Sequence, residues 1–269
     1  MGYERMSKAD GGLRRVRFGT AEWMRDLDRT NAWLLTVNGV PQSYVDLEDP
    51  THLAFDCYRR MGDVLDSLPA GPLEAIHIGG GAGTVPRYIA ATRPGSKQLV
   101  FDIDAELVEF VREWLDPRGV PGMEVEVLDG RVGVAMEPDA SVDLIILDAF
   151  ESGHVAGGLA SLEFTRDVAR VLRAPRTYII NTVDGPDMRF AKRLVATLTE
   201  VFGEVLLFAD ADVLSGSRSG NHVLVASDVR LPISELAERA VSAMFPVRLL
   251  VGDELRELCC GGEADVRYG

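Results

Sequence analysis

The chain has 269 residues, of which 46% are hydrophobic and 26% are charged, and its formal net charge is -14. This composition is typical of a globular protein with one large domain and room for a small appendage. The acidic balance and the absence of a long Lys/Arg cluster argue against nucleic acid as a partner and favour small cationic molecules.

The sequence also lacks the usual signs of a membrane, a disulfide framework or a metal. No apolar run is long enough to cross a membrane, and the charged N-terminus lacks the apolar segment of a secretory signal, so we expect a cytoplasmic protein with no membrane partner. Three cysteines without a CxxC spacing argue against a disulfide framework or a zinc site. The four histidines form no HxH or HxxxH pair, so we expect no metal.

The first 50 residues are expected to form short strands. The segments 13–29 and 32–47 are rich in strand-forming residues, and the second contains VNGV, in which Asn38 and Gly39 are typical of a two-residue hairpin turn. A helix is predicted to follow to about residue 68, with Asp49 as its cap and Pro50 at its first position.

From residue 73 onward, predicted strands alternate with predicted helices. The strands lie at 73–79, 97–104, 123–130, 142–150, 176–183, 204–209 and 220–227. The helices lie at 84–92, 105–115, 131–136, 159–172 and 187–202. This alternation predicts an α/β fold: a Rossmann-like, doubly wound, mainly parallel seven-stranded sheet, with an antiparallel edge strand formed by the last strand pair. We divide the chain into a β-rich N-terminal domain with a linking helix at residues 1–60 and a Rossmann-like domain at residues 61–269.

A glycine-rich turn, GGGAG, follows the strand at 73–79. Gly79, Gly81 and Gly83 lack Cβ atoms and let the backbone approach a ligand at the carboxyl edge of the sheet, where doubly wound folds bind their ligands. A tight turn without a ligand is the alternative interpretation. No Lys-Ser or Lys-Thr follows the glycines, which excludes a P-loop.

The next three strands each end in an aspartate: Asp102, Asp129 (followed by Gly130) and Asp148. Asp102 follows Gly79 at about the 20-residue spacing of an acid that binds ribose hydroxyls. A strand-end aspartate also commonly caps the next helix, but three of them behind a glycine turn favour a nucleoside site. The GxGxG spacing favours a ligand of the S-adenosylmethionine type over NAD, because such a ligand has no pyrophosphate to place at the helix N-terminus.

These motifs resemble, in the same order, those of the spermidine synthases (polyamine aminopropyltransferases). WLLTVNGVPQS resembles the family's N-terminal hairpin, IHIGGGAG its Gly-Gly-Gly-Asp-Gly turn, FDID its Glu-Ile-Asp, LDG its Asp-Gly, and DLIILDAFES its catalytic strand ending in Asp-Ser-x-Asp-Pro. The chain is accordingly identified as a divergent spermidine synthase-like member with a sheet of the class I methyltransferase type.

The resemblance implies a transferase that moves an aminopropyl group from decarboxylated S-adenosylmethionine to a small cationic amine, without a metal and as a homodimer. Asp148 is implied to take the proton of the attacking amine, which is largely protonated at neutral pH because its pKa is about 10. Glu151 is implied to hold the amine and Gln42 to face the donor, while His52 lies near the family's pocket tyrosine. The residues implied to bind the donor are Gly79, Gly81, Gly83, Asp102, Asp129 and Gly130. The segment 152–161 is implied to close over the site.

Two departures from the family pattern leave alternatives open. Ala82 replaces the acid of the glycine turn, which helps to hold the aminopropyl group in the family, and Glu151 replaces the second aspartate of the catalytic strand while the proline is lost. The alternatives are an S-adenosylmethionine-dependent methyltransferase and a non-catalytic homologue that binds a nucleoside or polyamine. Retention of Asp148 and Glu151 favours an enzyme.

Overall fold

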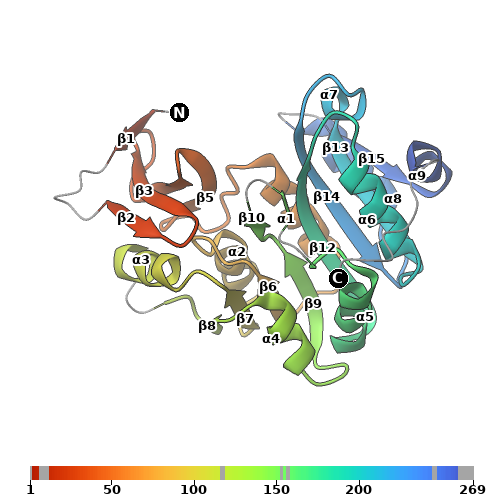
Figure 1. Ribbon diagram of the computed structural model, residues 1–269, viewed down its shortest axis with the longest axis horizontal. Coiled ribbons are helices and arrows are strands. Elements are labelled where there is room, and N and C mark those ends of the chain that lie inside the picture. Colours follow the sequence, from red (N-terminus) through yellow and green to blue (C-terminus); the bar gives the residue numbers. More distant parts are fainter. Residues whose placement is uncertain are drawn as a thin grey trace.

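The computed structural model describes residues 2–5, 12–115, 119–151, 154–155, 158–243 and 247–259. These residues form a small antiparallel sheet at the N-terminus, a large sheet flanked by helices, and a two-stranded ribbon. Figure 1 shows the N-terminal sheet beside α3 at one end of the large sheet, with β15 and α9 at the other end. No helix in the described ranges is long and apolar enough to cross a membrane.

The N-terminal sheet has the strand order β1-β3-β4-β5, with β2 paired to β3. Its strands are β1 (Tyr3–Arg5), β2 (Leu13–Val16), β3 (Gly19–Asp26), β4 (Ala32–Val37) and β5 (Val40–Asp46). The predicted hairpin turn is confirmed: Asn38 and Gly39 have φ values of 52° and 76°, the left-handed conformation that this turn requires at both positions. The Asn38 side chain also accepts from the N–H of Thr20, which ties the hairpin to β3.

The large sheet confirms the predicted mainly parallel, doubly wound class and adds one strand to it. Its strands are β6 (Glu74–Ile78), β7 (Lys97–Asp102), β8 (Met123–Val127), β9 (Val142–Leu147), β12 (Leu172–Asp184), β13 (Glu204–Asp210), β14 (Gly220–Ser227) and β15 (Val247–Val251). Within the described residues the order is β15-β13-β14-β12-β9-β6-β7-β8, so the sheet has eight strands rather than seven. The additional strand is β15, which pairs with β13 in an antiparallel manner.

The antiparallel strand β14 lies between β12 and β13, and not at the edge as predicted. After β12, the chain runs through α6 and forms β13 two strand positions away, so the position next to β12 stays open. It then returns through α7, and β14 fills the open position. Sequence alone showed a strand pair joined by a short connection, but not the gap that the second strand enters.

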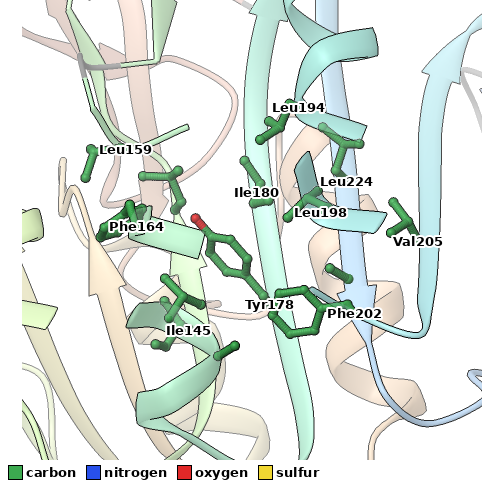
Figure 2. Packing of buried hydrophobic residues seen from close by; sticks show 14 of the residues in the cluster. Ile145, Leu159, Phe164, Tyr178, Ile180, Leu194, Leu198, Phe202, Val205 and Leu224 are labelled. Atoms are coloured by element: carbon green, nitrogen blue, oxygen red, sulfur yellow. The ribbon is translucent and has the colours of Figure 1, made fainter. Parts of the chain in front are cut away.

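Helices cover both faces of the large sheet. They are α1 (Asp56–Ser67), α2 (Thr84–Thr92), α3 (Ala105–Leu115), α4 (Gly130–Met136), α5 (Leu162–Val171), α6 (Arg189–Thr199), α7 (Ala211–Leu214), α8 (Ile233–Ser242) and α9 (Gly252–Cys259). One apolar cluster packs α4, α5, α6 and α9 against one face, and another packs α1, α2 and α8 against the opposite face. In the first cluster, Tyr178 of β12 packs against Phe202 with ring centroids 6.3 Å apart (Figure 2). Along β9, Ile145 faces the first cluster and Ile146 the second, as expected of a strand buried on both faces.

Helix α1 begins later than the sequence predicts. Its first residue is Asp56, and Phe55 is its N-cap. The Asp49 carboxylate accepts instead from the backbone N–H and hydroxyl of Thr51 and pairs with Arg29, so it stabilises a turn. Helix α1 packs on the large sheet, and the predicted domain boundary at residue 60 falls inside this helix. The domain division stays a prediction.

The N-terminal sheet attaches to α3 through aromatic side chains. Trp23 of β3 packs against Phe110 and Trp114, with ring centroids at 5.9 and 6.3 Å. Ala82 of the glycine turn belongs to the same apolar cluster. The N-terminal sheet therefore bears directly on the turn that follows β6.

Candidate active site

The glycine turn connects β6 to α2 and places backbone where side chains would collide. Gly79, Gly81 and Gly83 have φ values of 86°, 48° and 74°. A Cβ on Gly79 would lie 2.3 Å from the backbone oxygen of Asp148, the residue that follows β9. Glycine is thus required where the ends of β6 and β9 touch.

The turn rests on the N-terminal sheet through Ser43 of β5. The Ser43 Oγ accepts from the N–H of Ala82 at 3.0 Å, and a Cβ on Gly81 would lie 2.3 Å from that oxygen. Both Ser43 and Ala82 are almost fully buried. The backbone path of the turn therefore depends on a side chain from outside the Rossmann-like sheet, which the sequence analysis did not identify.

Asp102 lies at the end of β7 and faces the glycine turn, as predicted. Its two carboxylate oxygens accept from the backbone N–H groups of Gly80 and Asp104, each at 3.0 Å. Burial raises the pKa of the Asp102 carboxyl, and these backbone hydrogen bonds oppose the rise. A cavity of about 80 Å³ adjoins it. The cavity is lined by Gly80, Gly81, Ala82, Gly83, Arg87, Val100, Asp102, Val108, Val111, Arg112, Gly119, Met123 and Val125.

Asp129 and Gly130 have clear local roles at the start of α4. Asp129 is exposed and caps the helix, because its carboxylate accepts from the N–H of Arg131 at 2.8 Å. A Cβ on Gly130 would lie 2.3 Å from a methyl group of Ile78, so glycine allows α4 to pack closely on β6. These contacts match the capping interpretation, and the adenine-side role of the pair stays a prediction.

Asp148 lies directly after β9, and two neutral donors hold its half-buried carboxylate. The hydroxyl of Tyr58 donates to Oδ2 at 2.9 Å, and the amide Nδ2 of Asn181 donates to Oδ1 at 2.9 Å. In the described part of the chain, no ion pair joins Asp148 to a cationic side chain. Burial raises the pKa of the Asp148 carboxyl, while the hydrogen bonds from Asn181 and Tyr58 lower it. A carboxylate with a raised pKa is suited to accept a proton from a nucleophile.

Tyr58 is a site residue that the sequence analysis missed. It lies on the apolar face of α1, where a core role would be expected. Its hydroxyl is also 3.1 Å from the backbone oxygen of Gln42. His52, the predicted substrate-binding residue, packs against the ring of Tyr44 with centroids 5.7 Å apart, and no contact joins it to Asp148 within the described ranges. The structure thus brings Tyr58 of α1 to the predicted base, whereas His52 precedes the helix.

Gln42 and Glu151, the other two residues implied to line the site, lie on β5 and on the short strand after Asp148. The Gln42 side chain donates to the backbone oxygen of Val40 at 3.2 Å, and its own backbone oxygen lies near Tyr58. Glu151 belongs to the short strand β10 (Phe150–Glu151), whose backbone pairs with β11 (His154–Val155). The Glu151 side chain, and residues 152–153 and 156–157 of the predicted closing segment, lie outside the described residues.

No group of three or more metal-ligating side chains is placed to hold a metal ion among the residues that the structure describes. The geometry instead gathers carboxylates, backbone N–H groups and amides around the carboxyl edge of the large sheet. Such an arrangement binds hydroxyl-bearing and cationic ligands.

Comparisons with known proteins agree with this arrangement. No family model matches the chain. The chain is 33% identical over 141 residues to the polyamine aminopropyltransferase of Moorella thermoacetica, a match that covers 49% of this chain and 48% of the relative. It is 27% identical over 167 residues to the polyamine aminopropyltransferase of Neisseria meningitidis serogroup A, which covers 61% of this chain and 62% of the relative. The matches thus span between about half and somewhat less than two thirds of these curated relatives.

Solved structures extend the similarity to most of the chain. A protein described as a probable spermidine synthase from Corynebacterium glutamicum has a TM-score of 0.89 at 30% identity, with 96% of both chains covered. The spermidine synthase of Thermotoga maritima has a TM-score of 0.60 at 18% identity, over 86% of this chain and 77% of that one. Human methyltransferase-like protein 13, in complex with SAH, has a TM-score of 0.57 at 20% identity, over 78% of this chain and 95% of that one. The last two similarities concern the fold alone.

The fold is therefore that of the spermidine synthases, built on a sheet shared with methyltransferases. The chain belongs to the spermidine synthase (polyamine aminopropyltransferase) family, as a divergent member.

Proposed function

We propose that this protein is a spermidine synthase-like aminopropyltransferase, which moves an aminopropyl group from decarboxylated S-adenosylmethionine to an amine acceptor. The observation that carries the proposal is the Asp148 carboxylate, held by Tyr58 and Asn181 beside the glycine turn. A half-buried carboxylate without a cationic partner in the described part of the chain is free to meet a cation from solution. Its raised pKa brings it closer to the working range of a general base.

The reaction follows from these groups. An amine acceptor arrives mostly protonated, because its pKa is about 10. Asp148 accepts a proton from the ammonium, and the freed lone pair attacks the carbon next to the sulfonium of the donor. A C–N bond forms, the C–S bond breaks, and its electron pair remains on sulfur, which leaves neutral methylthioadenosine. Asp148 then releases the proton to solvent.

The donor is proposed to lie across the glycine turn, between Gly79 and Asp102. A carboxylate offers about four acceptor positions, and Asp102 uses two of them for backbone N–H groups, so acceptors remain for ribose hydroxyls. The adenine is proposed to lie toward Asp129 and Gly130. Close approach of the ligand to backbone at Gly81 and Gly83 requires no side chain to move.

The acceptor is proposed to lie between Asp148 and Glu151. A second carboxylate that holds the far cationic end of a diamine would fix the aim of the attacking nitrogen. The backbone oxygen of Gln42 is 3.1 Å from the hydroxyl of Tyr58, which brings β5 close to Asp148. As the resemblance implies, the active form is proposed to be a homodimer in the cytoplasm. Sedimentation tests the oligomeric state, and cell fractionation tests the location.

A methyltransferase is the second candidate, and one observation favours it. Ala82 puts no carboxylate in the glycine turn, and its N–H is already engaged by Ser43. An aminopropyl ammonium would therefore find no acid at this position of the turn. The intact donor S-adenosylmethionine differs from its decarboxylated form at that end of the molecule.

Calorimetric titration with S-adenosylmethionine, its decarboxylated form and methylthioadenosine separates these candidates. Preference for the decarboxylated donor and methylthioadenosine supports aminopropyl transfer, and a screen of diamines for methylthioadenosine release then identifies the acceptor. Preference for intact S-adenosylmethionine favours the methyltransferase. If none of the three binds, the enzyme proposal fails.

A further inference from the structure

Two asparagines, the buried Asn181 and the exposed Asn221, continue the hydrogen-bond chain from Asp148. Asn181 of β12 donates from Nδ2 to Oδ1 of Asp148 at 2.9 Å, and Asn221 of β14 donates from Nδ2 to Oδ1 of Asn181 at 3.2 Å. Three neighbouring strand positions, at the end of β9 and within β12 and β14, therefore contribute one side chain each. The proposed reaction uses Asn181 only to hold the carboxylate and assigns no role to Asn221.

The sheet register places the two amides on one face. Asn181 is opposite Val223 and Asn221 is opposite Val183, so the two asparagines are diagonal neighbours across an antiparallel pair. Thr182 lies between these positions on β12, and its side chain points to the other face of the sheet, because successive side chains alternate. The contact between the two amides thus depends on the position of β14 between β12 and β13.

The direction of each hydrogen bond from Asn221 to Asp148 follows from which groups can donate and which can only accept. An ionised carboxylate only accepts hydrogen bonds, so Asn181 must turn its NH₂ group toward Asp148 and its oxygen toward β14. Asn221 meets that oxygen with an NH₂ group of its own. Without Asn221, only the carboxylate would hold the Asn181 amide in this orientation, so the amide would be less firmly fixed.

We propose that Asn181 and Asn221 are positioning residues for Asp148: Asn221 fixes the orientation of the Asn181 amide, and Asn181 aims the Asp148 carboxylate and favours its ionised form. The consequence for catalysis rests on the proposed function, in which Asp148 is the base. Other titratable groups that face Asp148 in the described structure are Tyr58 and Cys57, both from α1. Tyr58 holds the other carboxylate oxygen, while Cys57 makes no described hydrogen bond to Asp148.

The experiment measures Asp148 directly. Protein with ¹³C-labelled aspartate carboxyls is titrated by NMR, and the Asp148 signal is assigned by its loss in Asp148→Asn. In Asn181→Ala we expect the pKa of Asp148 to rise by about one pH unit, the effect of losing one hydrogen bond to a charged group. In Asn221→Ala we expect a smaller rise. In the double variant we expect the rise of Asn181→Ala and no more, because Asn221 acts through Asn181.

Asn181→Leu, which keeps the volume of the side chain, repeats the test if Asn181→Ala does not fold. Thr182→Val is the matched control: it lies next to Asn181 on the same strand, is fully buried, and its hydroxyl has no hydrogen-bond partner among the described residues, so the pKa of Asp148 should not move. An unchanged pKa in both Asn181 variants overturns the proposal. A further rise when Asn221→Ala is added to Asn181→Ala overturns the claim that Asn221 acts through Asn181.

The titration requires no turnover, so it separates this inference from the proposed function. If the pKa moves as expected but no donor binds, the positioning role stands and the proposed reaction falls. If aminopropyl transfer is observed but the pKa does not move, the proposed function stands and the positioning role falls. If the positioning role and the proposed function are both correct, the acidic limb of the kcat/KM profile should move to higher pH in Asn181→Ala. The size of this move should equal the change in the NMR pKa of Asp148.

Discussion

The hydroxyl of Tyr58 donates to Oδ2 of Asp148 at 2.9 Å, although one residue belongs to a helix before the glycine turn and the other to a strand end far beyond it. Helix α1 packs on the face of the large sheet toward which Asp148 points, which brings the two together. Asn181 holds the other oxygen from β12. The carboxylate is thus fixed from two independent elements, and an amine would meet it from a direction that neither element occupies.

Replacement of Tyr58 by phenylalanine should move the acidic limb of activity to higher pH. A base acts in its ionised form, burial raises the pKa of Asp148, and the hydrogen bond from Tyr58 opposes this rise. Without the hydroxyl the pKa rises further, so kcat/KM on the acidic limb should fall by roughly tenfold for a rise of about one pH unit and recover as the pH increases. A pH–rate profile of both proteins checks this.

Tyr44→Phe is the matched control for Tyr58→Phe. It also removes a buried tyrosine–aspartate hydrogen bond, to Asp26 in the N-terminal sheet, but one that does not touch Asp148. It should lower stability and leave the acidic limb in place. If the acidic limb of the pH–rate profile is unchanged in Tyr58→Phe, or moves to lower pH, the assigned role of Tyr58 is contradicted.

Asp148→Asn should stabilise the fold at neutral pH while it abolishes turnover. The pKa of Asp148 is raised in the folded state, so ionisation of this group favours the unfolded chain. This destabilisation is absent below the unfolded pKa of about 3.9, grows as the pH rises toward the folded pKa and is constant above it. The free energy of unfolding at pH 7 should therefore increase by roughly 1 kcal/mol, in the range seen when an unfavourable charge is removed.

Urea unfolding of both proteins across pH 4 to 8 measures the gain in Asp148→Asn, which should shrink toward the acidic end. A variant less stable than the original protein at pH 7 would mean that the hydrogen bonds from Tyr58 and Asn181 outweigh burial. Retained turnover in Asp148→Asn would remove Asp148 from the mechanism.

The sequence predicted the features of the site that depend on one local pattern. The glycine turn, the strand-end positions of Asp102 and Asp148, and the mainly parallel sheet all follow from short motifs whose geometry is local. Tyr58 could not be recognised in this way, because a buried aromatic on an apolar helix face fits the core equally well, and its hydroxyl finds Asp148 only when α1 docks on the sheet. Asn181 and Asn221 were missed because their contact depends on the insertion of β14 between two other strands.

Gly79→Ala should be much more disruptive than Gly83→Ala. Both glycines have left-handed φ values, which cost an L-residue roughly 1–2 kcal/mol. A Cβ at Gly79 would also lie 2.3 Å from the backbone oxygen of Asp148, whereas a Cβ at Gly83 has its nearest neighbour at 3.9 Å. Gly79→Ala must therefore separate the ends of β6 and β9 and displace the proposed base.

Thermal unfolding and donor titration of both glycine variants provide the comparison. Gly83→Ala should lose about 1 kcal/mol and keep its donor affinity within a few-fold. Gly79→Ala should lose several kcal/mol or fail to fold. Equal losses in the two variants would show that the contact between Gly79 and Asp148 is not what restricts this position.

Ser43→Ala should weaken the link between the N-terminal sheet and the glycine turn. The Ser43 hydroxyl accepts from the N–H of Ala82 at 3.0 Å, and both residues are almost fully buried, so alanine would leave a buried donor without a partner. This costs about 1–3 kcal/mol. Because the same N–H fixes the path of the turn, donor affinity should fall several-fold as well.

Ser67→Ala, which removes a hydroxyl bonded to the backbone oxygen of Val64 within α1, is a control that should change neither stability nor donor affinity to that extent. If Ser43→Ala lowers stability but leaves donor affinity intact, the N-terminal sheet supports the fold without shaping the donor site.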